Sequence, residues 1–228
     1  MIGFRHTDPR FPFLWEDDSQ PPGRWHGEGE GPVHYFADTP DGAWAEFLRH
    51  EDITDPADVA EVRRAVWAVE LGRPPREEPE LGGRTLIGGL PSYRACQGEA
   101  RRLRARGAKG LVAPSAALLQ GAAHGWRVQG GLTRGAPRDG KVIALFGPRP
   151  DLVGWEAVHE GRPSARLLGR IRHFPGVASA SSGERARRAR RGAGPAGPGR
   201  TSPGRPGPRL LLQRARGTAR EAARRGSR

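Results

Sequence analysis

The feature of this sequence that most constrains its fold is an abrupt change of composition at Ser179. The last fifty residues contain no aromatic residue, Val, Ile or Lys, and they consist mainly of Arg, Gly, Ala, Pro and Ser. Such a segment cannot bury enough apolar surface to offset the entropy lost on ordering. We therefore predict one folded domain over residues 1–178 and a disordered Arg/Gly/Pro-rich tail over residues 179–228.

The positive charge of the 228-residue chain is concentrated in this terminal segment. Residues 1–178 hold 24 Lys and Arg against 23 Asp and Glu, whereas residues 179–228 hold 14 Arg against two Glu. The formal net charge of +13 therefore does not describe a basic surface on the folded domain. Two interpretations of the segment stay open: a basic tail that contacts nucleic acid or lipid, and an out-of-frame translation of GC-rich DNA.

The sequence contains a single cysteine, Cys96, and neither a CxxC pair nor a zinc-binding spacing. An internal disulfide is thus excluded, and we expect no metal cofactor. Residues 1–16 mix charged and aromatic side chains and lack the apolar run of a signal peptide. No segment approaches the roughly 20 apolar residues that span a bilayer. We expect a cytoplasmic protein with no membrane partner.

The clearest local signal predicts a helix from Pro40 to about His50. Asp38 or Thr39 supplies the N-cap, and proline occupies the first turn, where its missing N–H is not needed. The apolar residues of this segment follow the 3/4 spacing of one buried stripe: Ala43, Trp44, Phe47 and Leu48.

The other predicted elements are shorter or less sharply bounded. We predict strands at 32–37, 65–71, 109–113 and 142–146, a short helix from residue 56, a helix at 92–106, a surface loop at 73–80 and mixed structure at 155–172. Proline and glycine interrupt residues 1–31, which are therefore interpreted as ordered loop with short extended pieces. Short strands among helices of unequal length favour an α+β fold over regular βαβ repetition.

Two charged residues have unusual surroundings. Arg24 lies in a Gly-Arg-Trp segment, where small neighbours would let a guanidinium approach a phosphate. From the pattern alone, a surface arginine packed on the adjacent tryptophan is the simpler interpretation. Glu46 lies in the apolar part of the predicted helix, where an unpaired carboxylate is costly to bury. It either faces a cleft or pairs at the helix surface with Arg49 or His50.

Three further residues near these positions carry weaker signals. For His6 and His26, an exposed loop histidine is the simpler interpretation. Tyr35, on the predicted strand 32–37, is by itself a core aromatic residue with its hydroxyl at the edge of the core.

In order and spacing, these segments resemble the RES domain family of bacterial proteins. Residues 4–5 match an early aromatic-Arg pair of the family, and residues 23–25 match its Gly-Arg-Trp motif. Tyr35, followed eleven residues later by Glu46, matches a strand tyrosine and a helical glutamate. Residues 110–115 match a Gly-x-x-x-Pro-Ser/Ala segment that follows a long helix. Together these matches extend over most of the predicted domain.

The resemblance implies an ADP-ribosyltransferase-like fold, with NAD held in a cleft between two small sheets. It implies an enzyme that cleaves the nicotinamide–ribose bond of NAD and transfers ADP-ribose to water or inorganic phosphate, as a toxin neutralised by an antitoxin. Glu46, with Arg24 and Tyr35, would form the catalytic set, and Glu46 would stabilise oxocarbenium charge. Arg5 and Arg24 would hold the diphosphate, Tyr35 would border the nicotinamide or its ribose, and Ser115 would donate a hydrogen bond. If His6 or His26 faces the diphosphate, its charge would tune binding near neutral pH.

Two other functions are consistent with the sequence. The arginines of the tail would support salt-sensitive nucleic-acid binding without sequence preference, since the tail has no aromatic residue for base stacking. A RES-like fold that only binds a partner, without catalysis, is the second alternative. Deleting residues 179–228 separates the first alternative from an enzyme, and the Glu46→Ala substitution separates the second.

Overall fold

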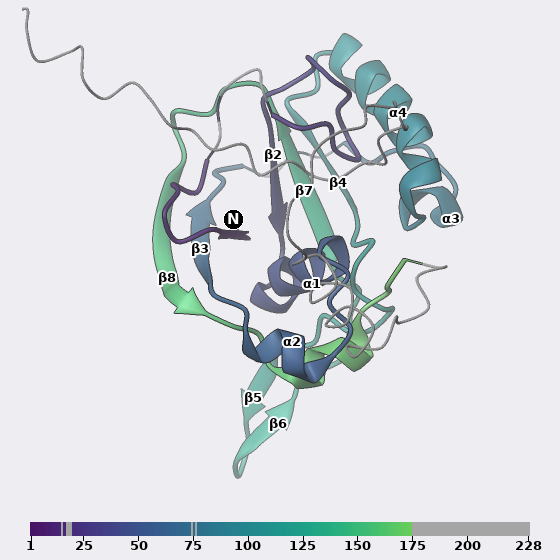
Figure 1. Cartoon of the computed structure of the whole chain (residues 1–228). Helices are drawn as coiled ribbons and strands as arrows, with labels where there is room; N and C mark the ends of the chain where they lie inside the picture. The colour runs from purple at the N-terminus through teal and green to yellow at the C-terminus, as the bar shows by residue number, and fades with distance from the viewer. Residues whose placement is uncertain (15, 17–19, 74, 76, 175–228) are drawn as a thin grey trace, which may run out of the picture. The chain divides into compact units, whose positions relative to one another are not determined.

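The computed structural model describes residues 1–14, 16, 20–73, 75 and 77–174. The described strands form one six-stranded antiparallel sheet and a two-stranded ribbon, accompanied by helices (Figure 1). The predicted α+β class is confirmed. In sheet order the six strands are β4 (Gly110–Pro114), β7 (Lys141–Phe146), β2 (Val33–Ala37), β1 (Ile2–Thr7), β3 (Arg64–Glu70) and β8 (Val153–Gly161). The ribbon pairs β5 (Trp126–Val128) with β6 (Leu132–Arg134).

The six-stranded sheet is nearly divided at its centre. β1 and β2 share a single registered pair, Phe4 with Ala37, whereas β1 and β3 are paired at six positions and β2 and β7 at five. The sheet therefore consists of two three-stranded halves, β4-β7-β2 and β1-β3-β8, that are joined at one point. This junction corresponds to the boundary between two small sheets at which a cleft is predicted.

Helix α1 (Pro40–His50) begins and ends as predicted and packs against the sheet (Figure 1). Thr39 caps it, because its Oγ1 accepts a hydrogen bond from the N–H of Gly42 at 3.0 Å. The predicted apolar stripe is buried. All of its residues except Ala43 pack in one core cluster with Val59, Val66 and Leu118. Burial of this stripe fixes the rotation of α1 about its axis, and thereby the direction of the polar residues between its apolar ones.

The remaining predicted helices also lie close to their expected positions. Asp55 caps α2 (Pro56–Ala60), and its Oδ1 accepts the N–H of Ala57 at 2.8 Å. Helix α4 (Tyr93–Ala105) ends just before Gly107, whose φ of +86° favours glycine. Three shorter helices were not predicted individually: α3 (Gly83–Leu86), η1 (Leu90–Ser92) and η2 (Ala165–Arg170).

Strand β1 differs most from the sequence-based expectation. Residues 1–31 are predicted to be mainly loop, whereas β1 lies in the middle of the sheet. The strand was missed because His6 falls on the side that Ile2 and Phe4 share and so breaks the alternation expected of a half-buried strand. Arg5 and His6 both belong to the residues that line the cavity described below.

The predicted disordered tail, residues 179–228, lies outside the described residues, and the domain boundary at residue 178 stays a prediction. Among the helices that the structure describes, none combines the length and the apolar character needed to cross a membrane.

Candidate active site

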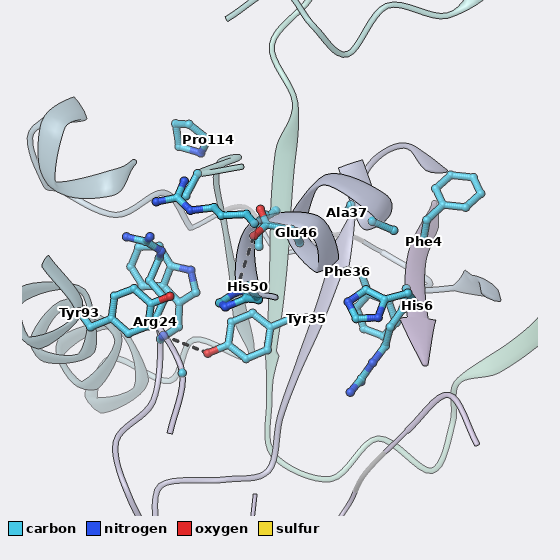
Figure 2. Close-up of a pocket in the computed structure, with 17 residues that line it drawn as sticks. Phe4, His6, Arg24, Tyr35, Phe36, Ala37, Glu46, His50, Tyr93 and Pro114 are labelled. Carbon is cyan, nitrogen blue, oxygen red and sulfur yellow. Dashed lines mark hydrogen bonds and ion pairs between the residues drawn. The ribbon is translucent and has the colours of Figure 1, made fainter. Parts of the chain in front are cut away.

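A cavity of about 250 Å³ lies where the two halves of the sheet meet beneath α1. Figure 2 shows Glu46 projecting from α1, with Arg24 and Tyr93 on one side of it and His6 on the other. The lining residues come from β1, the 23–25 segment, β2, α1, α4 and the ends of β4 and β7: Phe4, Arg5, His6, Gly23, Arg24, Trp25, Tyr35, Phe36, Ala37, Ala43, Glu46, Arg49, His50, Tyr93, Pro114, Ala116 and Val142. Among these described residues, three are arginines and one is a carboxylate.

Glu46 is held in place by Ser115, from the segment that follows β4. Ser115 Oγ donates to Glu46 Oε1 at 3.2 Å and accepts the backbone N–H groups of Ala117 and Leu118 at 3.2 and 3.1 Å. The serine is buried and lies behind the carboxylate rather than on the cavity wall. His50 Nε2 lies 4.0 Å from Glu46 Oε2, so the pairing with His50 that the helix spacing allowed is present beside the cavity.

Arg5 extends from β1 and has a guanidinium nitrogen, Nη1, that is buried without a hydrogen-bond partner among the described residues. Burial lowers the pKa of Arg5 to about 10, and the nearby Tyr35 opposes this shift. The side chain is still cationic at neutral pH. A buried guanidinium with an unsatisfied N–H is suited to receive an anionic group.

The simplest interpretation of its motif places Arg24 at the surface, packed on Trp25. The structure gives Arg24 other contacts. Its Nη2 donates to the carbonyl of Gly88 at 2.7 Å, and its Nη1 donates to Ser92 Oγ at 3.1 Å. Its guanidinium also lies over the ring of Tyr93, 4.7 Å from the centroid. Arg24 therefore attaches the 23–25 segment to the α3–η1 segment while its charge faces the cavity.

Arg49 is a cavity residue that the sequence-based reasoning missed. It was considered only as a surface partner of Glu46, yet it is 2% exposed and lines the cavity. Its Nη2 donates to the carbonyl of Gly88 at 2.9 Å, the same oxygen that Arg24 contacts. The spacing of three residues from Glu46 was the available signal, because residues i and i+3 share a helix face.

The hydroxyl of Tyr35 holds the 23–26 segment in place through two hydrogen bonds. It accepts the N–H of Trp25 at 2.9 Å and lies 2.8 Å from His26 Nδ1, while His26 Nε2 donates to the carbonyl of Pro21 at 2.9 Å. Because that carbonyl can only accept, His26 Nδ1 is the unprotonated nitrogen that accepts from Tyr35. Burial raises the pKa of Tyr35 well above its usual value. Gly23 is required here, since a Cβ would lie 2.8 Å from the Tyr35 hydroxyl.

Replacing Tyr35 by phenylalanine should destabilise the protein by about 1–3 kcal/mol, because the buried N–H of Trp25 and Nδ1 of His26 both lose their partner. The free energy of unfolding in urea measures the effect. Tyr93→Phe is the matched control, since the Tyr93 hydroxyl has no hydrogen bond within the described residues and the ring over Arg24 is retained. Equal stabilities of the two variants would contradict the anchoring role.

The two histidines are not exposed loop residues. His26 is 1% exposed, and burial lowers its pKa. His6 lies on β1 against the ring of Phe47, with 5.0 Å between ring centroids. Burial, with further contributions from Arg64, Arg5 and His50, lowers the pKa of His6 to about 3. Both pKa shifts favour the neutral imidazole at physiological pH, which disfavours the interpretation that the charge of these histidines tunes anion binding there.

A pH titration of stability should reveal the lowered pKa of His6. Because its pKa is about 3 in the folded protein and about 6.5 in the unfolded chain, the unfolded chain binds more protons between these values. The free energy of unfolding should therefore fall as the pH is lowered from about 6.5 towards 3. His6→Gln should make this slope shallower by up to one proton, or about 1.4 kcal/mol per pH unit. Identical slopes for the variant and the wild type would refute the assignment.

The structure thus brings together most of the residues that sequence reasoning selected. Arg5, Arg24, Tyr35 and Glu46 all line one cavity, and Ser115 contacts Glu46 from behind it. No cluster of three or more His, Cys, Asp or Glu that could hold a metal ion occurs in the part of the chain that the structure describes.

The fold and the site together define a mixed α/β protein whose split antiparallel sheet holds a cavity with guanidinium groups around one carboxylate. The model of the RES domain matches residues 4–163. The chain belongs to the RES domain family, as its motifs predicted.

Two similar proteins place this family assignment in context. Over 55 residues the chain is 45% identical to a probable NAD(+) phosphorylase, Rv3189, of Mycobacterium tuberculosis. That match spans 24% of this chain and 26% of the relative, so the chain matches about a quarter of the length of this curated protein. Among solved structures, a chain of the M. tuberculosis MbcT–MbcA toxin–antitoxin complex is similar, with a TM-score of 0.47 and 14% identity over 74% of this chain and 86% of that chain.

Proposed function

We propose that this chain cleaves the nicotinamide–ribose bond of NAD and transfers ADP-ribose to water or inorganic phosphate. The observation that carries this proposal is the placement of Glu46 in a cavity with Arg5, Arg24 and Arg49, where a carboxylate and several cations face the same space. Membership in the RES domain family supports the proposal, as does the name of the M. tuberculosis relative. NAD carries both a diphosphate and a cationic leaving group, which match this combination of charges.

Glu46 is the residue that we assign to the bond-breaking step. When the bond between ribose C1 and the nicotinamide nitrogen breaks, its electron pair leaves with the nicotinamide, which becomes neutral, and C1 acquires oxocarbenium character. A carboxylate fixed beside C1 stabilises this positive charge. No general acid is required, because the leaving group is already cationic. Ser115 contributes by holding one carboxylate oxygen and so limiting the rotation of the side chain.

The remaining site residues bind and orient the substrate in this proposal. Arg5 offers to the diphosphate its Nη1, which has no hydrogen-bond partner in the described part of the chain. Arg24 adds positive charge, and its N–H groups hold the α3–η1 segment against the cavity. Tyr35 presents its ring to the nicotinamide or its ribose, because its hydroxyl is engaged with Trp25 and His26.

We further propose that the protein acts in the cytoplasm as a toxin and that a cognate antitoxin covers the cavity. This role rests on the resemblance to RES domain proteins, many of which are toxins of such pairs. A gene for a small protein beside the gene for this chain, whose product binds the chain and blocks NAD cleavage, is the expected finding. A neighbouring product that leaves NAD cleavage unchanged would contradict the toxin role without affecting the proposed chemistry.

The test of the proposed reaction is an incubation of the full-length chain with NAD, with and without inorganic phosphate, followed by chromatography of the products. Nicotinamide should appear in both cases or only with phosphate. ADP-ribose as co-product indicates hydrolysis, whereas ADP-ribose 1″-phosphate indicates phosphorolysis. Absence of nicotinamide under both conditions, from a protein shown to be folded, would contradict the proposal.

A further inference from the structure

The guanidinium of Arg49 is buried, and its hydrogen-bonding capacity is only partly satisfied by the described residues. Its side chain is 2% exposed, and only one of its two terminal nitrogens has a partner among the described residues. Nη2 donates to Gly88 O at 2.9 Å, whereas Nη1 is buried without an acceptor. A buried N–H that lacks an acceptor is costly, and native structures nearly always satisfy such groups. Nη1 therefore indicates a ligand or a water molecule at this position.

The surroundings of Arg49 favour an anion as that ligand. Burial lowers the pKa of Arg49, the like charges of Arg24 and Arg172 lower it further, and the carboxylate of Glu46 opposes them. Arg172 is fixed close to Glu46, where its Nη1 donates to the carbonyl of Ala116 at 3.1 Å. The cluster of Arg24, Arg49 and Arg172 around Glu46 therefore carries an excess of positive charge, which a doubly charged anion would neutralise.

The geometry also distinguishes Arg49 from Arg24. Both of Arg24's terminal nitrogens donate within the protein, to the carbonyl of Gly88 and to Ser92 Oγ. Arg49 shares the Gly88 carbonyl with Arg24 but keeps Nη1 free of protein acceptors in the described part of the chain. The ring of Phe174 lies 4.4 Å over the guanidinium of Arg49 and closes one of its faces. An acceptor must therefore approach the edge of the guanidinium, where its N–H groups point.

We infer that Arg49 Nη1 binds a phosphoryl oxygen in this cavity and that Arg24 positions the Gly88 carbonyl that orients Arg49. The phosphoryl group belongs either to the diphosphate of NAD or to free inorganic phosphate. This inference rests on the proposed function for the identity of the nucleotide. If the group is inorganic phosphate, it lies on the Glu46 side of the cavity. One of its oxygens would then form the new bond to ribose C1 as the bond to nicotinamide breaks and the electron pair leaves with nicotinamide.

Binding measurements test the inference without relying on turnover. Isothermal titration calorimetry of the full-length chain with inorganic phosphate, and separately with ADP-ribose, gives a Kd for each source of the phosphoryl group. Arg49→Gln should weaken one of the two by at least about tenfold, because a charge-assisted hydrogen bond is lost. Weakened phosphate binding assigns the site to inorganic phosphate, and weakened ADP-ribose binding assigns it to the diphosphate. Arg94→Gln, at an exposed arginine of α4, is the matched control and should change neither.

Several outcomes would overturn the inference. The first is a wild-type chain that binds neither inorganic phosphate nor ADP-ribose. The second is a folded Arg49→Gln variant that binds both probes as the wild type does, which would mean that water alone satisfies Nη1. If Arg49→Gln does not fold, a crystal structure of the wild type with both probes decides: a phosphoryl oxygen bonded to Nη1 supports the inference, and its absence refutes it. Binding that depends on Arg49 without nicotinamide release would refute the proposed reaction alone.

Discussion

Replacing Glu46 by glutamine should reduce the rate of nicotinamide release by about 10²- to 10³-fold. Among the described residues that line the cavity, Glu46 is the only carboxylate, so the variant lacks the negative charge that the proposed reaction uses to stabilise the ribose cation. The fold should be retained, because the side chain is 23% exposed and a glutamine carbonyl still accepts the hydrogen bond of Ser115. Chromatographic measurement of nicotinamide at saturating NAD checks the prediction.

The control for this variant is Glu61→Gln, which removes the same charge at an exposed residue outside the cavity. Its activity should equal that of the wild type. A folded Glu46→Gln variant with wild-type turnover would show that the carboxylate has no part in the chemistry, whatever the fate of NAD in this cavity.

Replacing Trp25 by alanine should destabilise the protein by about 3–5 kcal/mol. The side chain is 1% exposed and belongs to the core cluster formed with Val33, Leu103, Leu111 and Phe146. Its removal leaves a cavity between the 23–26 segment and the half of the sheet that contains β4 and β7. The free energy of unfolding in urea measures the loss, which is large relative to the stability of a typical domain.

Trp126→Ala provides a comparison with the same change of side chain. Trp126 lies on β5, where it is 57% exposed, and its replacement should alter stability by less than about 0.5 kcal/mol. Similar losses for the two tryptophans would mean that the Gly-Arg-Trp segment is not anchored in the core as described.

Local signals explain why much of the fold was predictable from the sequence. The Thr39 cap, Pro40 and the 3/4 spacing of apolar residues define α1 within a dozen residues. Strands β2, β3, β4 and β7 were recognisable because each is a short run of mostly apolar residues, most of which are buried in the structure. In each case the information lies inside the element itself.

The contacts that were missed depend on partners that are distant in the sequence. Arg24 donates to residues more than 60 positions away, and the burial of Arg49 depends on Gly88 and Phe174. His26 is buried because Tyr35 and Pro21 enclose its two ring nitrogens. No local pattern reports such contacts. Glu46 was recognisable because a carboxylate among apolar helix residues conflicts with its immediate surroundings.

The measurement that bears most directly on NAD cleavage is a proton NMR time course of NAD mixed with the full-length wild-type chain. The nicotinamide ring resonances should move from their positions in NAD to those of free nicotinamide, with an equal amount of an ADP-ribosyl product. An unchanged NAD spectrum, in the presence of inorganic phosphate as well as in its absence, from a chain shown to be folded, would contradict the proposed function.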